Sequence, residues 1–212
     1  MQPYYLPFIG YFQLINYVDT FVIFDDTQFV KNGFGVQNKI GSEKISINIQ
    51  KRNKLDLIYK KKIFTSLYQA QIEKIRDICK DFKYYDEKIF DKIFEIPSNE
   101  SYFEFLFNQI KFVCEYLSIK TNILKSSEIY DTSDLKKQLK IYAICKKLNE
   151  FIYINPIGGK DLYSEEQFMQ NKIRLQFFNY KPFIGKKEDL DSILKIIFCY
   201  DIKEIKKSLL ID

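Results

Sequence analysis

The sequence predicts an α/β protein with a mostly parallel sheet and a helical insertion or cap in the middle of the chain. Two observations carry this prediction. Short apolar runs typical of buried strands alternate with amphipathic helical segments, and the helical segments gather between about residues 59 and 148. No internal repeat or low-complexity linker divides the 212 residues. We therefore expect residues 1–212 to form a single domain, with a helical excursion over about 59–148.

The first part of the chain contains the clearest strand signals. Two prolines keep residues 1–7 extended or turned, and apolar spacing over 8–15 predicts a short helix. The run 21–24, Phe-Val-Ile-Phe, is typical of a strand buried on both faces. Strict alternation over 44–49 predicts a half-buried strand.

Three- and four-residue apolar spacing predicts helices over 67–82, 98–117 and 133–148. Ser98 and Ser133 are the expected N-caps of the second and third. In the third helix, the side chains expected to face inward are Leu135, Leu139, Tyr142 and Leu148.

The remaining elements alternate in type. Residues 151–154 and 173–178 predict strands, and a short helix lies between them at 164–169. Two short amphipathic helices follow.

The chain contains no histidine, which excludes Ser-His-Asp and Cys-His nucleophilic sites and His-ligated zinc. Proton transfer must then use Asp, Glu, Lys, Tyr or Cys. The abundance of Ile, Lys, Asn, Phe and Tyr is also typical of AT-rich coding, which explains the missing histidine without a functional cause.

The net charge is +5, carried almost entirely by lysine, with arginine only at Arg52, Arg76 and Arg174. Because specific nucleic-acid recognition depends on the planar arginine fork, we expect no nucleic-acid partner. The four cysteines form no CxxC pair, and no signal peptide or apolar span is visible. These features predict a cytoplasmic protein that does not enter the membrane.

The first candidate site is the N-terminal loop, with Gln2, Tyr5, Gly10 and Tyr11. Two prolines and a glycine shape this loop at the start of a helix, where an anion can bind. The alternative is a rigid aromatic turn that plugs the core.

The second candidate site follows the strand at 21–24 and contains Asp25, Asp26, Gln28 and Lys31. Asp25 or Asp26 is the expected base or magnesium ligand, because no histidine is available. Gln28 could hold an amide and Lys31 a phosphate. The alternative is a strand-end turn with a solvated ion pair.

The third candidate site is the loop Gly158-Gly159-Lys160 after the strand at 151–154. It lacks the GxxxxGK[ST] spacing of a P-loop, so an ordinary Gly-Gly turn is the alternative to phosphate binding.

The segments QPYYLPFIGYFQLIN, FVIFDDTQFVK and NKI, with the later INPIGGKDLY, resemble the WbqC-like proteins. These are encoded among bacterial O-antigen and other surface-polysaccharide genes. The resemblance implies a cytoplasmic enzyme that transfers an acyl or aminoacyl group, such as glycyl, to the amine of a nucleotide-activated amino sugar. The alternatives are a non-catalytic nucleotide or sugar-nucleotide binding module, or an assembly partner in the same pathway.

In this hypothesis Asp25 or Asp26 deprotonates the amine or holds magnesium, while Lys31 and Lys160 neutralise phosphate. The residues expected to orient the sugar are Gln2, Tyr5, Gln28 and Asn38. ATP and magnesium are possible cofactors, and the oligomeric state is left open.

The chain departs from the family pattern at three places. Only Met1 precedes Gln2, where relatives usually have a short strand; Val36-Gln37-Asn38 replaces Asn-Arg-Asn; and Lys61-Lys62 replaces a Lys-His pair. Residues 7–11 also resemble a histidine-free version of the P-x-H-x-G-H signature of nucleotidyltransferases. That similarity implies a Rossmann-like sheet.

Overall fold

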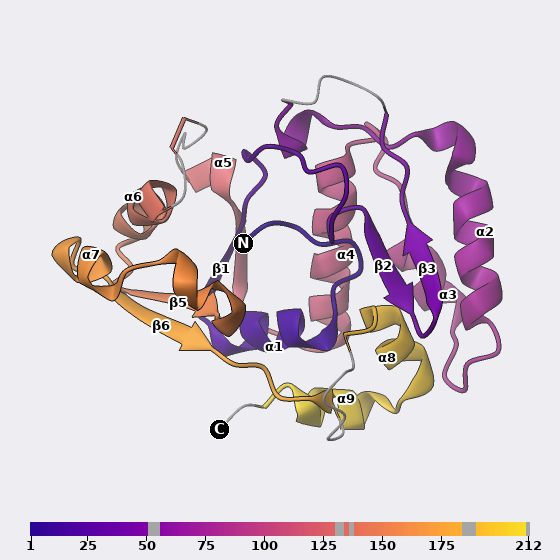
Figure 1. Cartoon of the computed structure of the whole chain (residues 1–212). Coiled ribbons are helices and arrows are strands. Elements are labelled where there is room, and N and C mark those ends of the chain that lie inside the picture. The colour runs from indigo at the N-terminus through magenta and orange to yellow at the C-terminus, as the bar shows by residue number, and fades with distance from the viewer. Residues whose placement is uncertain (51–55, 130–133, 136–137, 184–189, 211–212) are drawn as a thin grey trace.

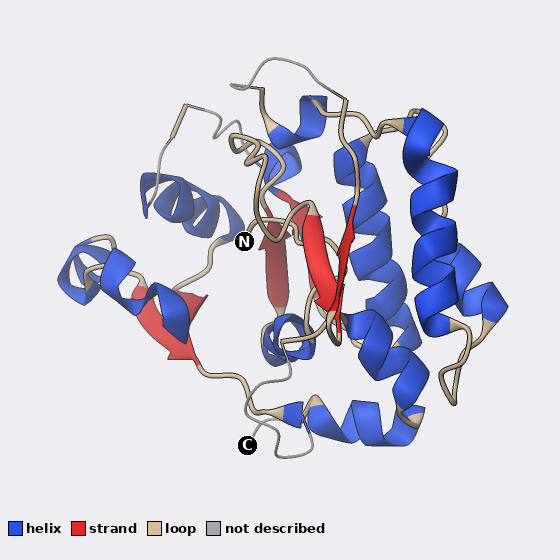
Figure 2. Cartoon of the chain, turned by 45° about the vertical axis from the view of Figure 1, so that its right-hand side comes forward, coloured by secondary structure: helices blue, strands red, loops and turns tan. Residues whose placement is uncertain are grey.

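Helices surround three two-stranded β-sheets in the computed structural model, which describes residues 1–50, 56–129, 134–135, 138–183 and 190–210 (Figures 1 and 2). The strands are β1 Thr20–Ile23, β2 Gln37–Ile40, β3 Glu43–Ser46, β4 Asn122–Lys125, β5 Ile152–Pro156 and β6 Arg174–Phe178. The α-helices are α1 Ile9–Tyr17, α2 Tyr68–Cys79, α3 Glu87–Ile93, α4 Tyr102–Tyr116, α5 Ser126–Ile129, α6 Gln138–Leu148, α7 Glu165–Gln170, α8 Ile193–Cys199 and α9 Ile202–Ser208. Short 3-10 helices are η1 Ile58–Lys60, η2 Thr65–Leu67 and η3 Ile157–Leu162.

The predicted α/β class is confirmed, but its sheet is divided. Strands β1 and β4 pair in parallel, as do β5 and β6, while β2 and β3 form an antiparallel hairpin. The described residues contain no continuous parallel sheet of the Rossmann-like kind that joins these pairs. The Rossmann-like arrangement therefore remains unconfirmed.

Strand β1 lies where the apolar run predicts it. Phe21 and Ile23 are buried, whereas Val22 and Phe24 are half-buried, so one face is less enclosed than predicted. Its parallel partner β4, residues 122–125, is absent from the prediction. A strand of four residues with a polar residue at each end carries little local signal.

The helical predictions hold in outline and differ in register. Helix α4 is capped by Ser101, whose Oγ accepts a hydrogen bond from the Glu104 amide at 3.3 Å, and not by Ser98. In α6, Leu139 is 57% exposed, while Lys140 is buried. The prediction that Leu139 faces inward is therefore wrong, and the Ser133 cap lies outside the described residues.

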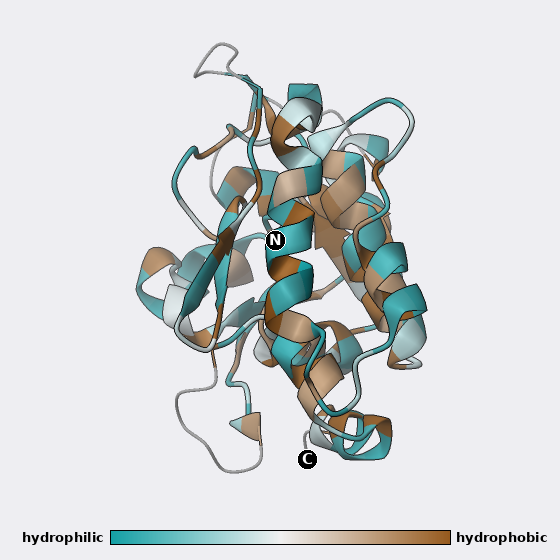
Figure 3. Cartoon of the chain, turned by 90° about the vertical axis from the view of Figure 1, so that its right-hand side faces the viewer, coloured by the Kyte–Doolittle hydropathy of each residue, from teal (hydrophilic) through white to brown (hydrophobic). Residues whose placement is uncertain are grey.

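Two hydrophobic clusters form the core. The larger one contains most of α1, α4 and α8. Figure 3 views the side that carries α2 and shows hydrophilic and hydrophobic residues alternating along the helices. The smaller cluster comprises Ile141, Cys145, Phe168, Ile173 and Leu175, from α6, α7, β6 and the residue before it. Figure 1 shows these elements to one side of the molecule. Phe24, at the end of β1, packs against the smaller cluster.

Candidate functional site

The carboxyl ends of β1 and β4 meet at one edge, because the parallel register places Ile23 opposite Lys125. Asp25 lies two residues beyond β1, and Ser126 follows β4 directly. Open α/β sheets bind ligands beyond the carboxyl ends of their parallel strands. This edge is therefore the first place to look for a site.

Asp25 is held by the two serines that follow β4. Its Oδ1 accepts hydrogen bonds from Ser126 Oγ at 2.9 Å and from the Ser127 amide at 3.0 Å, and its Oδ2 accepts one from Ser127 Oγ. The Asp25 backbone amide in turn donates to Ser126 Oγ at 3.3 Å. These contacts fix one orientation of the carboxylate, which is 3% exposed.

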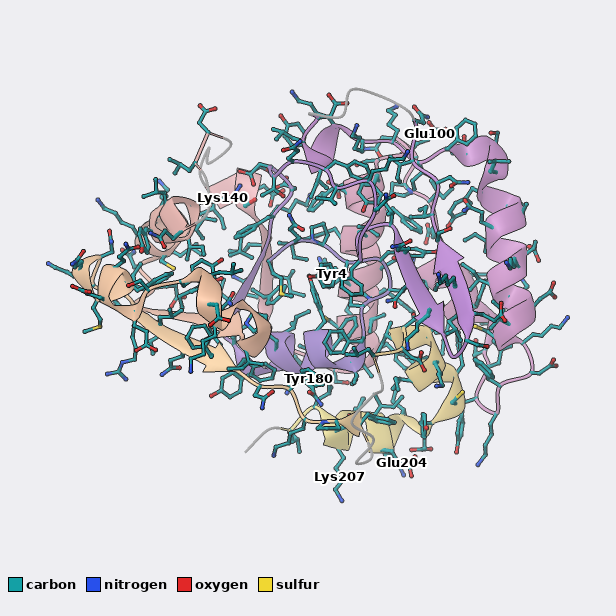
Figure 4. All side chains as sticks on the ribbon, in the orientation of Figure 1. Tyr4, Glu100, Lys140, Tyr180, Glu204 and Lys207 are labelled. Carbon is teal, nitrogen blue, oxygen red and sulfur yellow. The ribbon has the colours of Figure 1, made fainter. Side chains whose placement is uncertain are left out.

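Asp26 contacts one of the same two serines and also a buried lysine. Its Oδ1 accepts a hydrogen bond from Ser126 Oγ and forms an ion pair with the Nζ of Lys140, labelled in Figure 4. The side chains of Asp26 and Lys140 are both 4% exposed. Ser126 thus lies between two carboxylates, although its hydroxyl has a single proton to donate.

A cleft of about 450 Å³ opens beside Asp25. It is lined by Asp25, Tyr59, Lys60, Lys61, Lys62, Asn99, Ser101, Phe103, Glu104, Lys125, Ser127 and Glu128. We call it the lysine cleft, because four ammonium groups line it against three carboxylates. Its size falls within the roughly 300–1,000 Å³ typical of small-molecule sites.

The four lysines differ in how they are held. Lys61 Nζ lies 3.1 Å from Asp56 Oδ2, and Lys125 Nζ lies 3.0 Å from Glu104 Oε1 and 3.3 Å from Glu128 Oε1. Burial alone would lower the pKa of Lys125, but the hydrogen bonds that its ammonium donates to these two glutamates raise the pKa above its usual value. Lys60 and Lys62 also line the cleft, and neither forms an ion pair with another described residue.

The described residues also form a second, smaller hollow of about 180 Å³. It is lined by Gln2, Pro3, Tyr4, Gln28, Phe29, Val30, Gly33, Phe34, Gly35, Ile58 and Tyr102. We call it the aromatic slot. Two of the residues predicted to bind substrate, Gln2 and Gln28, line it.

Four other residues that were predicted to bind substrate support the fold instead. Tyr5 and Tyr11 are at most 1% exposed, and burial raises the pKa of both well above the usual value for tyrosine. Asn38 Nδ2 donates to the Tyr5 and Leu6 carbonyl oxygens at 3.1 and 2.6 Å. A side chain at Gly10 would approach Phe8 to 2.4 Å. None of these four predicted residues lines either hollow.

The third predicted loop lies apart from both hollows. Gly158, Gly159 and Lys160 belong to η3, and Lys160 is exposed. A Cβ at Gly159 would lie 2.2 Å from Asn155 Nδ2, so glycine is needed there for packing. Lys31 is also exposed and lines neither hollow.

Several residues of the site are missing from the sequence prediction. They are Ser126, Ser127, Lys140, Lys125 and the run Lys60–Lys62. The run was visible as the densest basic segment of the chain, but a short run of lysines is more often a solvated face. The serines had no signal, because the strand before them was not recognised.

The described residues contain no group of three or more Asp, Glu or Cys side chains placed to hold a metal ion. In the same part of the chain, no helix has the length and apolar character needed to cross a membrane.

The fold and the site together define an α/β protein with a charged cleft at the ends of a parallel strand pair. The model of the WbqC-like protein family matches residues 2–194, and the chain belongs to that family. The chain is 26% identical over 216 residues to "Uncharacterized protein Rv1507c" of Mycobacterium tuberculosis, covering 93% of this chain and 91% of that protein. No solved structure matches the chain.

Proposed function

We propose that the protein is a cytoplasmic enzyme of surface-polysaccharide biosynthesis. It transfers an acyl or aminoacyl group to the amine of a nucleotide-activated amino sugar. The observation that carries the proposal is the position of Asp25 at the wall of a cleft that also presents Lys60, Lys61, Lys62 and Lys125. A diphosphate needs clustered positive charge, and an attacking amine needs a carboxylate beside it.

In the proposed reaction, the amine nitrogen of the sugar attacks the carbonyl carbon of an activated acyl donor, such as a thioester or an acyl phosphate. A carbon–nitrogen bond forms, and the bond to the leaving group breaks with its electron pair. The amine proton passes to the carboxylate of Asp25. Lys60 and Lys62 hold the diphosphate, in place of Lys31 and Lys160, because they line the cleft. Asp26 stays ion-paired to Lys140 and positions Asp25 through Ser126.

The test is direct. Purified protein is incubated with dTDP-4-amino sugars and with glycine plus ATP, glycyl thioester or glycyl phosphate. Mass spectrometry then looks for the amide. A new amide that disappears in Asp25→Asn supports the proposal, whereas no amide across the panel overturns it.

The second candidate is a non-catalytic sugar-nucleotide binding module. Both carboxylate oxygens of Asp25 already accept hydrogen bonds from Ser126 or Ser127, which favours a positioned binding group over a mobile base. Tight binding of a sugar nucleotide by calorimetry, without turnover on the same panel, would select this candidate.

A further inference from the structure

Ser127 presents a hydroxyl group to the lysine cleft from a sharp turn between a strand and a helix. Strand β4 ends at Lys125, and helix α5 begins at the next residue, Ser126. Ser127 is exposed and lines the cleft, whereas Ser126 is fully buried. In α/β-hydrolases, a turn from strand to helix exposes the serine nucleophile at the end of the sheet. Of the two serines that contact Asp25, Ser127 is therefore the one that a ligand in the cleft can reach.

The Ser127 hydroxyl already donates its proton to a carboxylate. Its Oγ lies 2.5 Å from Asp25 Oδ2, which accepts the hydrogen bond. Asp25 Oδ1 accepts two more, from the Ser127 amide at 3.0 Å and from Ser126 Oγ at 2.9 Å, so the carboxylate is held in place. A hydroxyl within hydrogen-bond reach of a base, with a third group orienting that base, is the arrangement of an activated nucleophile. This pair needs no histidine.

Ser101, the other serine that lines the cleft, is held differently. Its Oγ accepts a hydrogen bond from the Glu104 amide at 3.3 Å, as the N-cap of α4. Within the described part of the chain, Ser101 Oγ donates to no carboxylate. The contact with a carboxylate therefore distinguishes Ser127 from Ser101.

Lys125 supplies positive charge at the same turn. It precedes Ser127 by two residues and lines the same cleft. Burial opposes its charge, but the hydrogen bonds that it donates to Glu104 and Glu128 raise its pKa, so the ammonium keeps its proton. A fixed ammonium group opposes the negative charge that develops on a carbonyl oxygen under attack.

From these contacts we infer that Ser127 is the nucleophile of a two-step transfer and carries the acyl group as an ester before the amine receives it. The inference rests on the proposed function and adds a covalent intermediate to it. It also predicts that the acyl donor and the sugar nucleotide react in turn, each in its own step.

In the first step, Ser127 Oγ attacks the carbonyl carbon of a thioester or acyl phosphate. A carbon–oxygen bond forms, and the bond to the leaving group breaks with its electron pair. The hydroxyl proton passes to Asp25 and from there to the leaving group. In the second step, the amine of the sugar attacks the ester, a carbon–nitrogen bond forms, and the bond to Ser127 Oγ breaks with its electron pair. Asp25 takes the amine proton and returns it to Ser127 Oγ.

The probe that tests the inference is p-nitrophenyl acetate, an activated ester that carries no nucleotide. The unmodified protein should release a rapid burst of about one equivalent of p-nitrophenolate, as expected when an acyl-enzyme accumulates. Mass spectrometry of the digested protein should place the acetyl group on Ser127. Hydroxylamine should remove it, because hydroxylamine cleaves an ester and leaves the amide of an acetylated lysine intact. Acetyl groups found on lysines alone would overturn the inference.

Variants test the two roles separately. Ser127→Ala should lose both the burst and the label, and Asp25→Asn should slow the burst by about 10²- to 10⁴-fold, because a general base is lost. Ser42→Ala, an exposed serine in the turn between β2 and β3, is the matched control and should keep both. A burst that is unchanged in Ser127→Ala would overturn the inference. The labelled residue is identified in the unmodified protein, so this evidence does not depend on whether a variant folds.

The inference and the proposed function can fail separately. If Ser127 is acetylated but no amide forms with any amino sugar, the transferase fails and the nucleophile stands. If Ser127→Ala forms the amide with unchanged kcat, the nucleophile fails and the transferase stands, with the amine attacking the donor directly.

Discussion

Lys140 of α6 and Asp26 beyond β1 form an ion pair in which each side chain is only 4% exposed. Lys140 lies next to Ile141, a member of the smaller hydrophobic cluster, whereas β1 belongs to the larger one. The pair therefore joins the two halves of the core through charge, at the same place where Phe24 joins them through apolar contact.

Lys140→Met should lower the free energy of unfolding by about 3–5 kcal/mol, because it removes the Lys140 ammonium from the buried Asp26 carboxylate. Urea denaturation measures this. Lys146→Met, an exposed lysine on the same helix, is the control and should change stability by less than about 0.5 kcal/mol. The double variant Lys140→Met/Asp26→Leu should recover much of the loss. Equal loss in the single and double variants would contradict the pairing.

Asp25→Asn should lower kcat for amide formation by about 10²- to 10⁴-fold, because the amide cannot take the amine proton. The KM for the sugar nucleotide should change little, since the lysines hold the diphosphate. Steady-state kinetics separate the two effects. The control is Asp19→Asn, an exposed carboxylate before β1, which should keep full activity. An Asp25→Asn enzyme with unchanged kcat would remove Asp25 from the chemistry.

Lys62→Ala should weaken pyrophosphate binding by about 10- to 100-fold, the equivalent of one charge-assisted contact of roughly 1.5–3 kcal/mol. Affinity of the unmodified protein should also fall as salt rises, because the contact is ionic. Lys44→Ala, on the exposed face of β3, serves as the control. If both variants weaken binding equally, general positive charge rather than the cleft attracts the anion.

Gly159→Ala should lower the free energy of unfolding by about 1–3 kcal/mol, because its Cβ would approach Asn155 Nδ2 to 2.2 Å. Gly158→Ala meets nothing within 4 Å and is the natural comparison. Thermal or urea unfolding of the two variants distinguishes packing from phosphate binding. If either variant bound pyrophosphate more weakly, this loop would belong to the binding site after all.

Alkaline pH should destabilise the protein through Cys79. Burial raises the pKa of this thiol from 9.0 to about 12, with the neighbouring Cys199 adding to the rise. In the unfolded chain the thiol loses its proton at lower pH than in the folded protein. The stabilisation that Cys79 contributes is therefore fully present below pH 9 and is lost as the pH rises toward 12. A difference of three units in pKa between the folded and unfolded states corresponds to at most about 4 kcal/mol of folding stability.

Urea unfolding across pH 8 to 11 tests this linkage. Cys79→Ala should reduce the slope of stability against pH without abolishing it, because burial also raises the pKa of Cys114 to about 12 and that of Cys145 to about 11. Ile75→Val, which removes packing from the same helix but no titrating group, should keep the full slope. An unchanged slope in Cys79→Ala would mean that another group carries the alkaline transition.

The sequence reveals those parts of the site that follow a strong local pattern. The place of Asp25 and Asp26 just beyond β1 could be predicted, because they directly follow four apolar residues. The lysine run at 60–62 is visible in the sequence, but the cleft that it lines is not. Lys140 could not be predicted, because only its distant partner Asp26 makes its burial tolerable. For the same reason, the inward face of α6 includes Lys140 where the apolar spacing placed Leu139.

Ser126, which lies between the carboxylates of Asp25 and Asp26, couples the cleft to helix α6. The single hydroxyl proton of Ser126 cannot be donated fully to Asp25 and Asp26 at once. A ligand that changes the charge at Asp25 therefore shifts this proton toward or away from Asp26, which is paired with Lys140. Because such coupling is reciprocal, a change in α6 that alters the Asp26–Lys140 ion pair also changes the affinity of the cleft for its ligand. The rate of amide hydrogen exchange in α6, a helix that does not line the cleft, should therefore change when a ligand binds. Ser126→Ala should abolish this change.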